Sequence, residues 1–555
     1  MIGVVTHAGD SDLVREFFEL FKTPWEWYRA EEQYDVVLIA RADVGTIDYR
    51  AKVLVIYGGQ ETSVDAKFSI KVMTHLQPEV LSYRGGCLPL YGKSCALQAE
   101  SVSFLHDKSS HQAGGVLCHA RNQVVARVGY DLFREMKALL RDGQPTEHAG
   151  IPTVEKHIAV LRDLIIEAGV TLIEIPPVPA GYRFIACLTH DVDHPLMRRH
   201  RWDHTMFGFL YRAIFGSLGK TLTRRMPIRH LLTNWAAAAK VPFVHLGLAE
   251  DPWYRFDHYL DIEKEAASTF FVLPFKNNPG RTVQGMAPQK RASSYGVAEL
   301  ADQLSILVSR GSEIGLHGLD AWLDNSKGKQ ERDEVARVTG KPHLGVRMHW
   351  LYFGADSPEK IEQAGFLYDS TVGYNHTIGY RAGTTQVFRP IGTTTLLELP
   401  LHIMDTAMFR PNYLNLTHNG AKESISRMIE DALVFGGALT VNWHDRSIAP
   451  ERLWKDFYVW LVAELRGKGA WCTNAGCAVA WFQKRRSVVF RRIDRGMQVT
   501  LAEAAAGTDV GSPALRVRVY NSQGPMDSLM KPYVDTTLTT DQTCIVSAAT
   551  SSICS

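Results

Sequence analysis

The sequence predicts an α/β protein in which a Rossmann-like α/β domain precedes a distorted (β/α) barrel and a small β-rich extension follows it. The length of 555 residues allows about three or four domains. Short β-branched runs alternate with helix-like segments along most of the chain, which is typical of parallel sheets covered by helices. A stiff, proline-rich stretch at 176–181 interrupts this alternation. We therefore expect domains over 1–180, 181–487 and 488–555.

The first domain, 1–180, begins with apolar runs that are separated by helix-like segments. Strands are expected at Ile2–Thr6, Asp35–Ala40 and Val53–Tyr57, and helices at Leu13–Phe21 and Thr153–Ala168. Because strands and helices alternate, we expect a parallel sheet. The domain has neither a G-x-G-x-x-G sequence nor a Walker loop, so no nucleotide cofactor is assigned to it.

The second domain, 181–487, repeats the β/α alternation over a length that suits a barrel of the TIM type, which takes about 250 residues. Strands are expected at Phe184–Leu188, Thr269–Leu273, Glu313–Leu316 and Leu439–Trp443. Helices are expected near Tyr259–Ala266, Val297–Arg310, Pro358–Ala364, Ala421–Phe435 and Pro450–Arg466. An insertion at about 195–257 interrupts this pattern.

The last region, 488–555, has the pattern of strands, at Val488–Arg491, Met497–Leu501 and Leu515–Tyr520. Its final stretch, 536–555, is rich in Thr and Ser and lacks an apolar period. We expect a disordered tail there, and a non-native scar is the alternative.

Composition limits the classes of function. The 61 basic and 59 acidic residues give a formal net charge of +2, and 45% of residues are hydrophobic. This balance is that of a globular protein and provides no overall basic field for nucleic acid. The start of the chain lacks a signal-peptide pattern, no stretch reaches the ~18 apolar residues of a spanning helix, and the eight cysteines are scattered. These features predict a cytoplasmic protein with reduced thiols.

Three segments place titratable side chains at or just after predicted strands, which is where barrel active sites are built, and a further one is an extended segment. In the first segment, Asp191 and Asp193 would share one face of an extended chain, and such a pair needs a cation, a proton or an arginine between its members. The others contribute His317, the pair Arg347 and His349, and the pair His444 and Asp445. Taken singly, the aspartates could cap a helix and the histidine could be structural.

Together, and in this order, the segments resemble the polysaccharide deacetylase family, the NodB-type carbohydrate esterases of family four. The resemblance covers roughly 183–482. It includes His190-Asp191-Val192-Asp193, the strand at 267–272, Glu313 to Gly318, Arg347-Met348-His349, Tyr368-Asp369-Ser370 and Trp443-His444. The segments 251–257 and 379–384 also resemble a large bacterial branch of this family that carries an N-terminal α/β module.

The resemblance implies a role for each matching residue. Asp191 would be the catalytic base, Arg347 would orient it, and His444 would be the acid. Asp193 and His317 would bind a divalent metal ion, Zn²⁺ foremost, with Co²⁺ and Mn²⁺ as alternatives. The family usually has a second metal histidine four residues after the first, but that position is Ala321. The third ligand would then be His349, which we favour, or Asp320.

The function that the resemblance implies is removal of acetyl groups, chiefly N-acetyl, from a polysaccharide or glycan precursor. Trp350, Arg381 and Trp443 are the expected substrate contacts, and Asp405 could also reach the site. Ala321 keeps a second hypothesis open, that of a catalytically impaired barrel that binds glycan or assists in its assembly. A third hypothesis is a different C–N hydrolase, because a fold alone does not fix the substrate.

The insertion is locally cationic. Residues 195–230 contain eight Arg or Lys and one acid, Asp203. Apolar residues recur there at helical spacing, at Phe207, Leu210, Tyr211, Ile214, Phe215 and Leu218. Such a helix could pack on its own domain as a lid, or lie on an anionic membrane surface. The second interpretation predicts a peripheral location at the inner membrane face.

Overall fold

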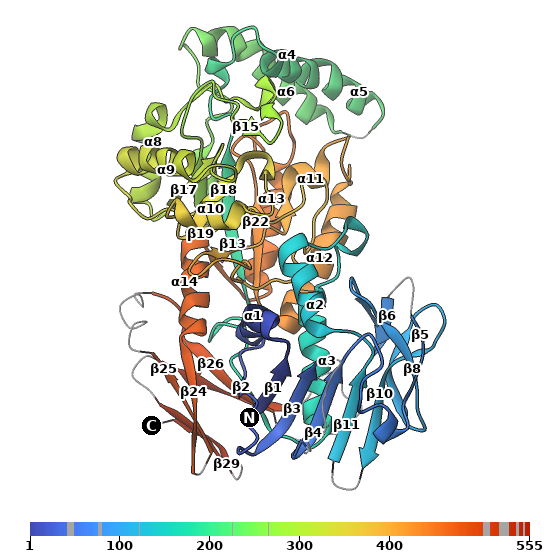
Figure 1. The fold of residues 1–555 in the computed structure, drawn as a ribbon. Coiled ribbons are helices and arrows are strands. Elements are labelled where there is room, and N and C mark those ends of the chain that lie inside the picture. The colour runs from blue at the N-terminus through green and yellow to red at the C-terminus, as the bar shows by residue number, and fades with distance from the viewer. Residues whose placement is uncertain are drawn as a thin grey trace.

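The computed structural model describes residues 1–41, 49–75, 80–120, 123–224, 226–264, 266–494, 496–502, 511–520, 532–539, 543–547 and 550–554. A central barrel carries the helical insertion at one end, the top in Figure 1. Two sheets lie at the other end: that of the N-terminal domain, in blue, and that of the C-terminal extension, in red. The α/β fold class predicted from the sequence is confirmed.

The N-terminal domain contains a nine-stranded sheet whose halves differ. Its order is β2-β1-β3-β4-β11-β10-β9-β6-β7. The parallel half comprises β1 (Ile2–Thr6), β2 (Trp25–Trp27), β3 (Tyr34–Ala40), β4 (Ala51–Tyr57) and β11 (Gln123–Val128). The antiparallel half comprises β10 (Ala113–Ala120), β9 (Val102–Asp107), β6 (Val80–Tyr83) and β7 (Gly86–Pro89). A separate pair consists of β5 (Lys71–His75) and β8 (Cys95–Gln98).

The prediction of a parallel sheet is therefore wrong for the second half. Between β4 and β11 the described chain has no α-helix, only a 3-10 turn at Ala66–Phe68. Parallel neighbours need long crossover connections, whereas only two residues separate β10 from β11, and this pair is antiparallel. The helices α1 (Ser11–Phe21), α2 (Leu132–Lys137) and α3 (Thr153–Glu167) pack on the apolar sheet as part of one core.

The barrel is a curled parallel sheet of order β20-β19-β18-β17-β14-β13-β22-β21. Its strands are β13 (Phe184–Val192), β14 (Thr269–Val272), β17 (Glu313–Gly318), β18 (Val346–Met348), β19 (Tyr368–Asp369), β20 (Leu397–Glu398), β21 (Ile403–Met404) and β22 (Ala438–Asn442), and β23 (Ala470–Thr473) pairs with the start of β13. The two edge strands belong to one segment, because only 399–402 separate them. Tyr368 of β19 pairs with Leu397 of β20, and Ile403 of β21 pairs with Val441 of β22. This bent segment therefore links both edges of the sheet, and it contains Pro400. The predicted distorted barrel is thus confirmed.

Helices surround the barrel. They are α7 (Phe256–Glu263), α8 (Ala301–Ser309), α9 (Asn325–Thr339), α10 (Ser357–Gln363), α11 (Asp405–Phe409), α12 (His418–Phe435), α13 (Lys455–Gly467) and α14 (Ala475–Arg486). The five helices predicted here are confirmed, with ends shifted by a few residues. The sequence did not reveal α9, because it is largely polar and buries only Gly328, Glu331 and Val335.

The insertion forms a helical unit of its own, built from α4 (His204–Tyr211), α5 (Ser217–Leu222) and α6 (Ile228–His245). Met206, Phe209, Val241 and Val244 belong to its small core. Within the described part of the chain, no helix combines the length and the apolar character needed to cross a membrane.

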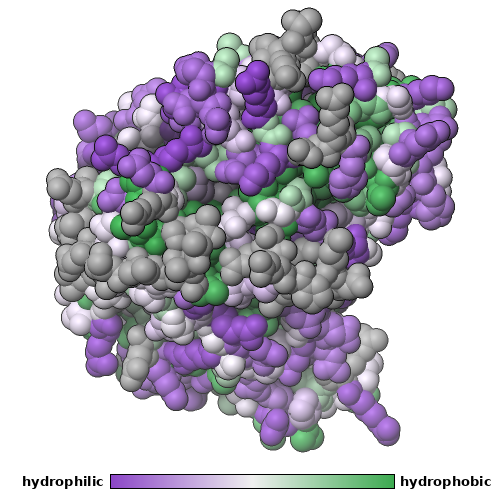
Figure 2. All heavy atoms as spheres, turned by 90° about the horizontal axis from the view of Figure 1, so that it is seen from below, coloured by the Kyte–Doolittle hydropathy of each residue, from purple (hydrophilic) through white to green (hydrophobic). Residues whose placement is uncertain are grey.

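The C-terminal extension contributes to two sheets. One has the order β24 (Val488–Ile493), β25 (Gly496–Leu501), β28 (Cys544–Ser547) and β29 (Thr550–Cys554). The other pairs β26 (Leu515–Tyr520) with β27 (Tyr533–Leu538) and with β12 (Leu172–Glu174) from the end of the N-terminal domain. The described parts of 536–555 are therefore strands and not the expected disordered tail, because their β-branched residues pair with β25 and β26. Among the residues that Figure 2 colours in its view from below, hydrophilic side chains are more extensive than hydrophobic ones.

Candidate active site

The site lies at the carboxyl ends of the barrel strands. β13 extends further than predicted, to Val192, so Asp191 is the penultimate residue of the strand and Asp193 follows it directly. His317 is near the end of β17, Arg347 is within β18, and His349 comes directly after β18. Because parallel strands bring their carboxyl ends to one edge, these distant residues meet in one place.

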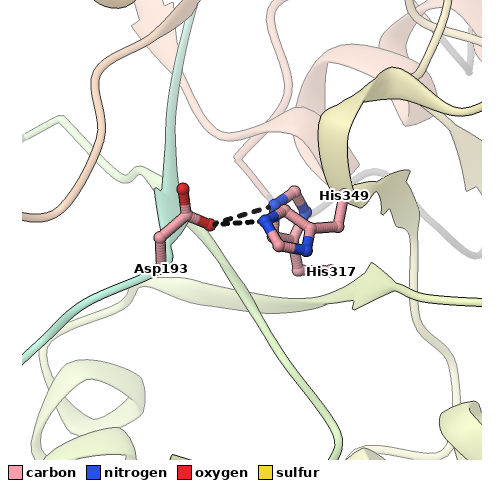
Figure 3. A group of neighbouring side chains, drawn as sticks. All are labelled: Asp193, His317 and His349. Atoms are coloured by element: carbon pink, nitrogen blue, oxygen red, sulfur yellow. Dashed lines mark ion pairs between the residues drawn. The ribbon is translucent and has the colours of Figure 1, made fainter. Parts of the chain in front are cut away.

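Three side chains form a group that could hold a metal ion: Asp193, His317 and His349 (Figure 3). Asp193 Oδ1 lies 3.4 Å from His317 Nε2 and 3.5 Å from His349 Nε2. Ligands about 2.0–2.1 Å from a tetrahedral ion are separated from one another by about 3.3 Å. Both distances from Asp193 therefore match the ligand spacing of a tetrahedral metal site.

The hydrogen bonds around this triad also fit a metal. Asp193 Oδ1 is buried without a hydrogen-bond donor among the described residues. His317 Nδ1 lies 2.9 Å from the Arg347 carbonyl oxygen, so it donates there and leaves the lone pair of Nε2 directed at the centre. Burial lowers the pKa of His349 well below its ordinary value, which favours the neutral, ligating imidazole. Despite its burial, the pKa of Asp193 is held well below the ordinary value by the surrounding His349, His317 and His444.

Of the two candidates for the third ligand, the structure brings His349 into the triad and not Asp320. Asp320 Oδ1 accepts a hydrogen bond from the Arg281 backbone N–H at 2.6 Å. The neighbouring Ala321 is fully buried in the barrel core. A Cβ built on Gly328 of α9 would lie 3.0 Å from the Cβ of Ala321, so α9 packs closely against this position.

Asp191 is held by two donors. Arg347 Nη1 donates to Asp191 Oδ1 at 3.0 Å, and Asn442 Nδ2 donates to Oδ2 at 2.7 Å. The fully buried Arg347 also donates to the Thr189 hydroxyl and to the Ser370 carbonyl and hydroxyl oxygens. Asn442 and Ser370 were not predicted as site residues individually. The signal for Asn442 is a polar side chain within the apolar run of β22.

His444 is paired with a second buried carboxylate, that of Asp405. His444 Nδ1 lies 2.6 Å from Asp405 Oδ1, and the His444 backbone N–H donates to Oδ2. Burial alone would lower the pKa of His444, but the Asp405 carboxylate, with Asp193 and Asp191, raises it to about 9. His444 Nε2 is 3.8 Å from Asp193 Oδ2. Asp405 therefore reaches the site, as the sequence suggested.

A cavity of about 490 Å³ opens over these groups. Asp191, Asp193, His317, His349 and His444 line it, together with the predicted substrate contact Trp350. Further lining residues that the sequence did not reveal are Lys290, Tyr352, Arg410 and Tyr413. The cavity thus combines polar chemistry at its base with aromatic and cationic walls.

The other two predicted substrate contacts do not line this cavity. Trp443 is fully buried and stacks on Phe457 and Tyr458 of α13. Arg381 lies beside Gly143 of the N-terminal domain, where its carbonyl oxygen accepts a hydrogen bond from the Gln144 N–H at 2.7 Å. We therefore correct both predictions: Trp443 belongs to the packing of the barrel and Arg381 to the contact between domains.

No protein-family profile and no curated protein matches this sequence. Among solved structures, a protein from Mycobacterium smegmatis designated a polysaccharide deacetylase is similar, with 18% identity, 55% of this chain and 93% of that chain covered, and a TM-score of 0.33. The Puue allantoinase is 14% identical, with 55% of this chain and 91% of that chain covered and a TM-score of 0.31. A Pseudomonas aeruginosa protein designated a polysaccharide deacetylase is 14% identical, with 42% of this chain and 95% of that chain covered and a TM-score of 0.29. These similar structures include proteins of the kind that the motifs resemble, but likeness at this level says nothing about activity, which has to come from the side chains described above.

Proposed function

We propose that this protein is a metal-dependent hydrolase that removes acetyl groups, N-acetyl foremost, from a polysaccharide or glycan precursor. One observation carries the proposal: a three-residue group that could hold a metal ion shares its cavity with an oriented carboxylate and an oriented imidazole. Asp191 Oδ2 lies 3.8 Å from His317 Nε2, and His444 Nε2 lies 3.8 Å from Asp193 Oδ2. Each proton-transfer group is therefore adjacent to one member of the triad.

Asp193, His317 and His349 would hold the ion. A divalent ion in such a site supplies a Lewis acid and lowers the pKa of bound water. Asp191 accepts the proton of the attacking water, since the hydrogen bonds from Arg347 and Asn442 leave further lone pairs on its oxygens. The hydrogen bond from Arg347 fixes this carboxylate in orientation.

His444 is suited to the opposite task. With its pKa raised to about 9, it carries a proton at neutral pH. It can donate that proton to the departing amine while Asp405 fixes the ring through Nδ1. The amide and one water become acetate and a free amino sugar, and no other reactant is needed.

The walls of the cavity support a glycan as the substrate. Trp350, Tyr352 and Tyr413 offer aromatic faces against which sugar rings can pack. Lys290 and Arg410 add positive charge, which suits a glycan that carries carboxylate or phosphate groups.

The test is acetate release from a panel of N- and O-acetylated oligosaccharides. The protein is stripped with a chelator and resupplied separately with Zn²⁺, Co²⁺ or Mn²⁺. We expect release only after metal is restored, and the preferred linkage identifies the bond. Asp193→Asn is the matched inactive control, because it preserves the shape of the side chain.

The outcomes separate the remaining hypotheses. A folded protein that binds about one ion per chain but releases no acetate would indicate another C–N hydrolase. A folded protein that binds no ion would overturn the proposal and favour a catalytically impaired, glycan-binding barrel. The position of Ala321 does not favour impairment, since it lies in the core and His349 completes the triad.

A further inference from the structure

The helical insertion exposes an unusual amount of apolar surface. α6 has two apolar faces. On one of them Ala237, Ala238, Val241 and Val244 are buried in the core of the insertion. Its opposite face carries Ile228, Leu232, Trp235, Phe243 and Leu246, whose exposed fractions lie between 41% and 71%. These five follow one another at intervals of three to eight residues, which places them in a single row along the helix.

A second exposed row begins at α4 and consists of aromatic residues. Phe207, Tyr211 and Phe215 are four residues apart and are all exposed, and Trp202, at 81% exposure, contacts Phe207. The rings of Tyr211 and Phe215 are 6.1 Å apart. Trp235 of the first row donates its indole N–H to the Ile214 carbonyl oxygen, so the two rows lie next to each other. Together they form one face, which we call the apolar face.

The charged residues within the stretch that carries most of the apolar face have one sign. Between 204 and 249 the sequence contains no Asp or Glu. Lys220, Arg224, Arg229 and Lys240 are exposed there. Asp203, just before this stretch, is engaged in capping α4 and in a contact with His200 at 2.7 Å. The stretch 204–249 therefore supplies no acid to neutralise these cations, and the next acids of the insertion, Glu250, Asp251 and Asp257, follow it.

The charge decides what kind of surface covers the apolar face. A second copy of this chain would bring cations against cations, which disfavours self-association through this face. A nucleic acid would meet the cations but leave the aliphatic and aromatic rows facing water. An anionic bilayer satisfies both, since apolar and aromatic side chains enter the boundary of headgroups and acyl chains while Lys and Arg meet the phosphates.

We propose that the helical insertion binds the apolar face to the surface of an anionic lipid bilayer. His204, the first residue of α4, lines the catalytic cavity, and Trp202 and Phe207 lie within three residues of it. The bound bilayer would thus lie beside the cavity. If the proposed deacetylation is correct, this placement favours a glycan carried on a lipid anchor as the substrate.

The experiment is sedimentation of the full chain with phosphatidylcholine vesicles, with and without phosphatidylglycerol. We expect binding only to the anionic vesicles, weakened by added salt, because surface charges are screened over about 10 Å at 0.1 M. The apolar variant combines Phe207→Ser, Tyr211→Ser and Phe215→Ser. The charge variant combines Lys220→Glu, Arg224→Glu and Arg229→Glu. Each should lower the partition coefficient by about tenfold or more.

The matched control is Val434→Ser with Val459→Ser, which removes exposed apolar side chains from α12 and α13. It should bind vesicles like the unchanged protein. No vesicle binding, equal binding to neutral and anionic vesicles, or a face that drives dimer formation in solution would each overturn the proposal. Acetate release from soluble oligosaccharides should be equal in all variants, so failure of catalysis and failure of membrane binding can be told apart.

Discussion

Asp191 and Asp193 are two residues apart at the end of one strand, yet their surroundings are opposite. Both oxygens of Asp191 accept hydrogen bonds, from Arg347 and from Asn442. Asp193 Oδ1 is buried with two imidazoles nearby and no donor among the described residues. The protein alone completes the first half of the site, whereas the second half, Asp193 with His317 and His349, is a group that could hold a metal ion.

This difference has an energetic side. A buried carboxylate is tolerated when it is paired and hydrogen-bonded, as Asp191 is. The Asp193 side chain is only partly buried, and despite desolvation the neighbouring histidines hold its pKa well below the ordinary value, so it presents a carboxylate to which a cation could bind. We therefore expect metal to stabilise the fold through Asp193 and to leave the environment of Asp191 nearly unchanged.

The largest effect is expected from Asp193→Asn. Loss of a residue that hydrogen-bonds to a metal ligand typically lowers metal affinity by about 10- to 100-fold. Loss of the ligand itself should lower the affinity by more than that. Metal content, measured on purified protein, should fall to near zero, and acetate release should disappear with it. The rise in melting temperature on addition of Zn²⁺ should also vanish. A variant that retains one ion per chain would contradict the assignment of the metal half.

Asp191→Asn should separate the two halves. Loss of a general base typically costs about 10²- to 10⁴-fold in turnover. Metal content and the metal-induced rise in melting temperature should stay normal, because the triad is intact. Near-normal turnover would show that another group takes the proton, and lost metal would show that the halves are not independent.

Asp405→Asn should change the pH profile more than the maximal rate. Asp405 is the largest cause raising the pKa of His444 to about 9, and burial acts in the opposite direction. As an acid, His444 works only while protonated, so activity should be lost as the pH rises through its pKa. Without the carboxylate that pKa falls, and the alkaline limb of kcat/KM should move to lower pH by about one unit or more. An unmoved limb would exclude His444 as the acid.

The smallest effect is expected from Asp320→Asn, whose partner is the Arg281 backbone N–H and not the triad. Metal affinity should remain within about threefold of the unchanged protein, whereas His349→Ala should lower it by about 100-fold or more. Titration of the stripped proteins with Zn²⁺ compares the two directly. The reverse ranking would make Asp320 the third ligand.

The site was more predictable from the sequence than its surroundings. Asp191, His317, Arg347 and His444 each belong to a motif at the end of an apolar run, and parallel strands bring such ends together. Trp443 was misjudged because side chains alternate across a strand: Asn442 faces Asp191, so its neighbour points away and packs on α13.

Other features depend on contacts that no local pattern contains. The place of Arg381 is set by residues 143 and 144 of another domain. The antiparallel half of the first sheet depends on which strands pair with one another. The sequence from β5 to β11 does not itself show which strand is the neighbour of which. The closing of the barrel through the bend at Pro400 likewise becomes visible only when both neighbours of that segment are known.

The pairing of β12 with β26 has a consequence for how the protein is made. β12 ends the N-terminal domain, but its partner leaves the ribosome only after the whole barrel has been synthesised. Arg485, also late in the chain, donates to the carbonyl oxygens of Glu19, Leu20 and Ile175. The domain that emerges first is therefore completed last, and during synthesis it carries an open strand edge of the kind that invites misassembly.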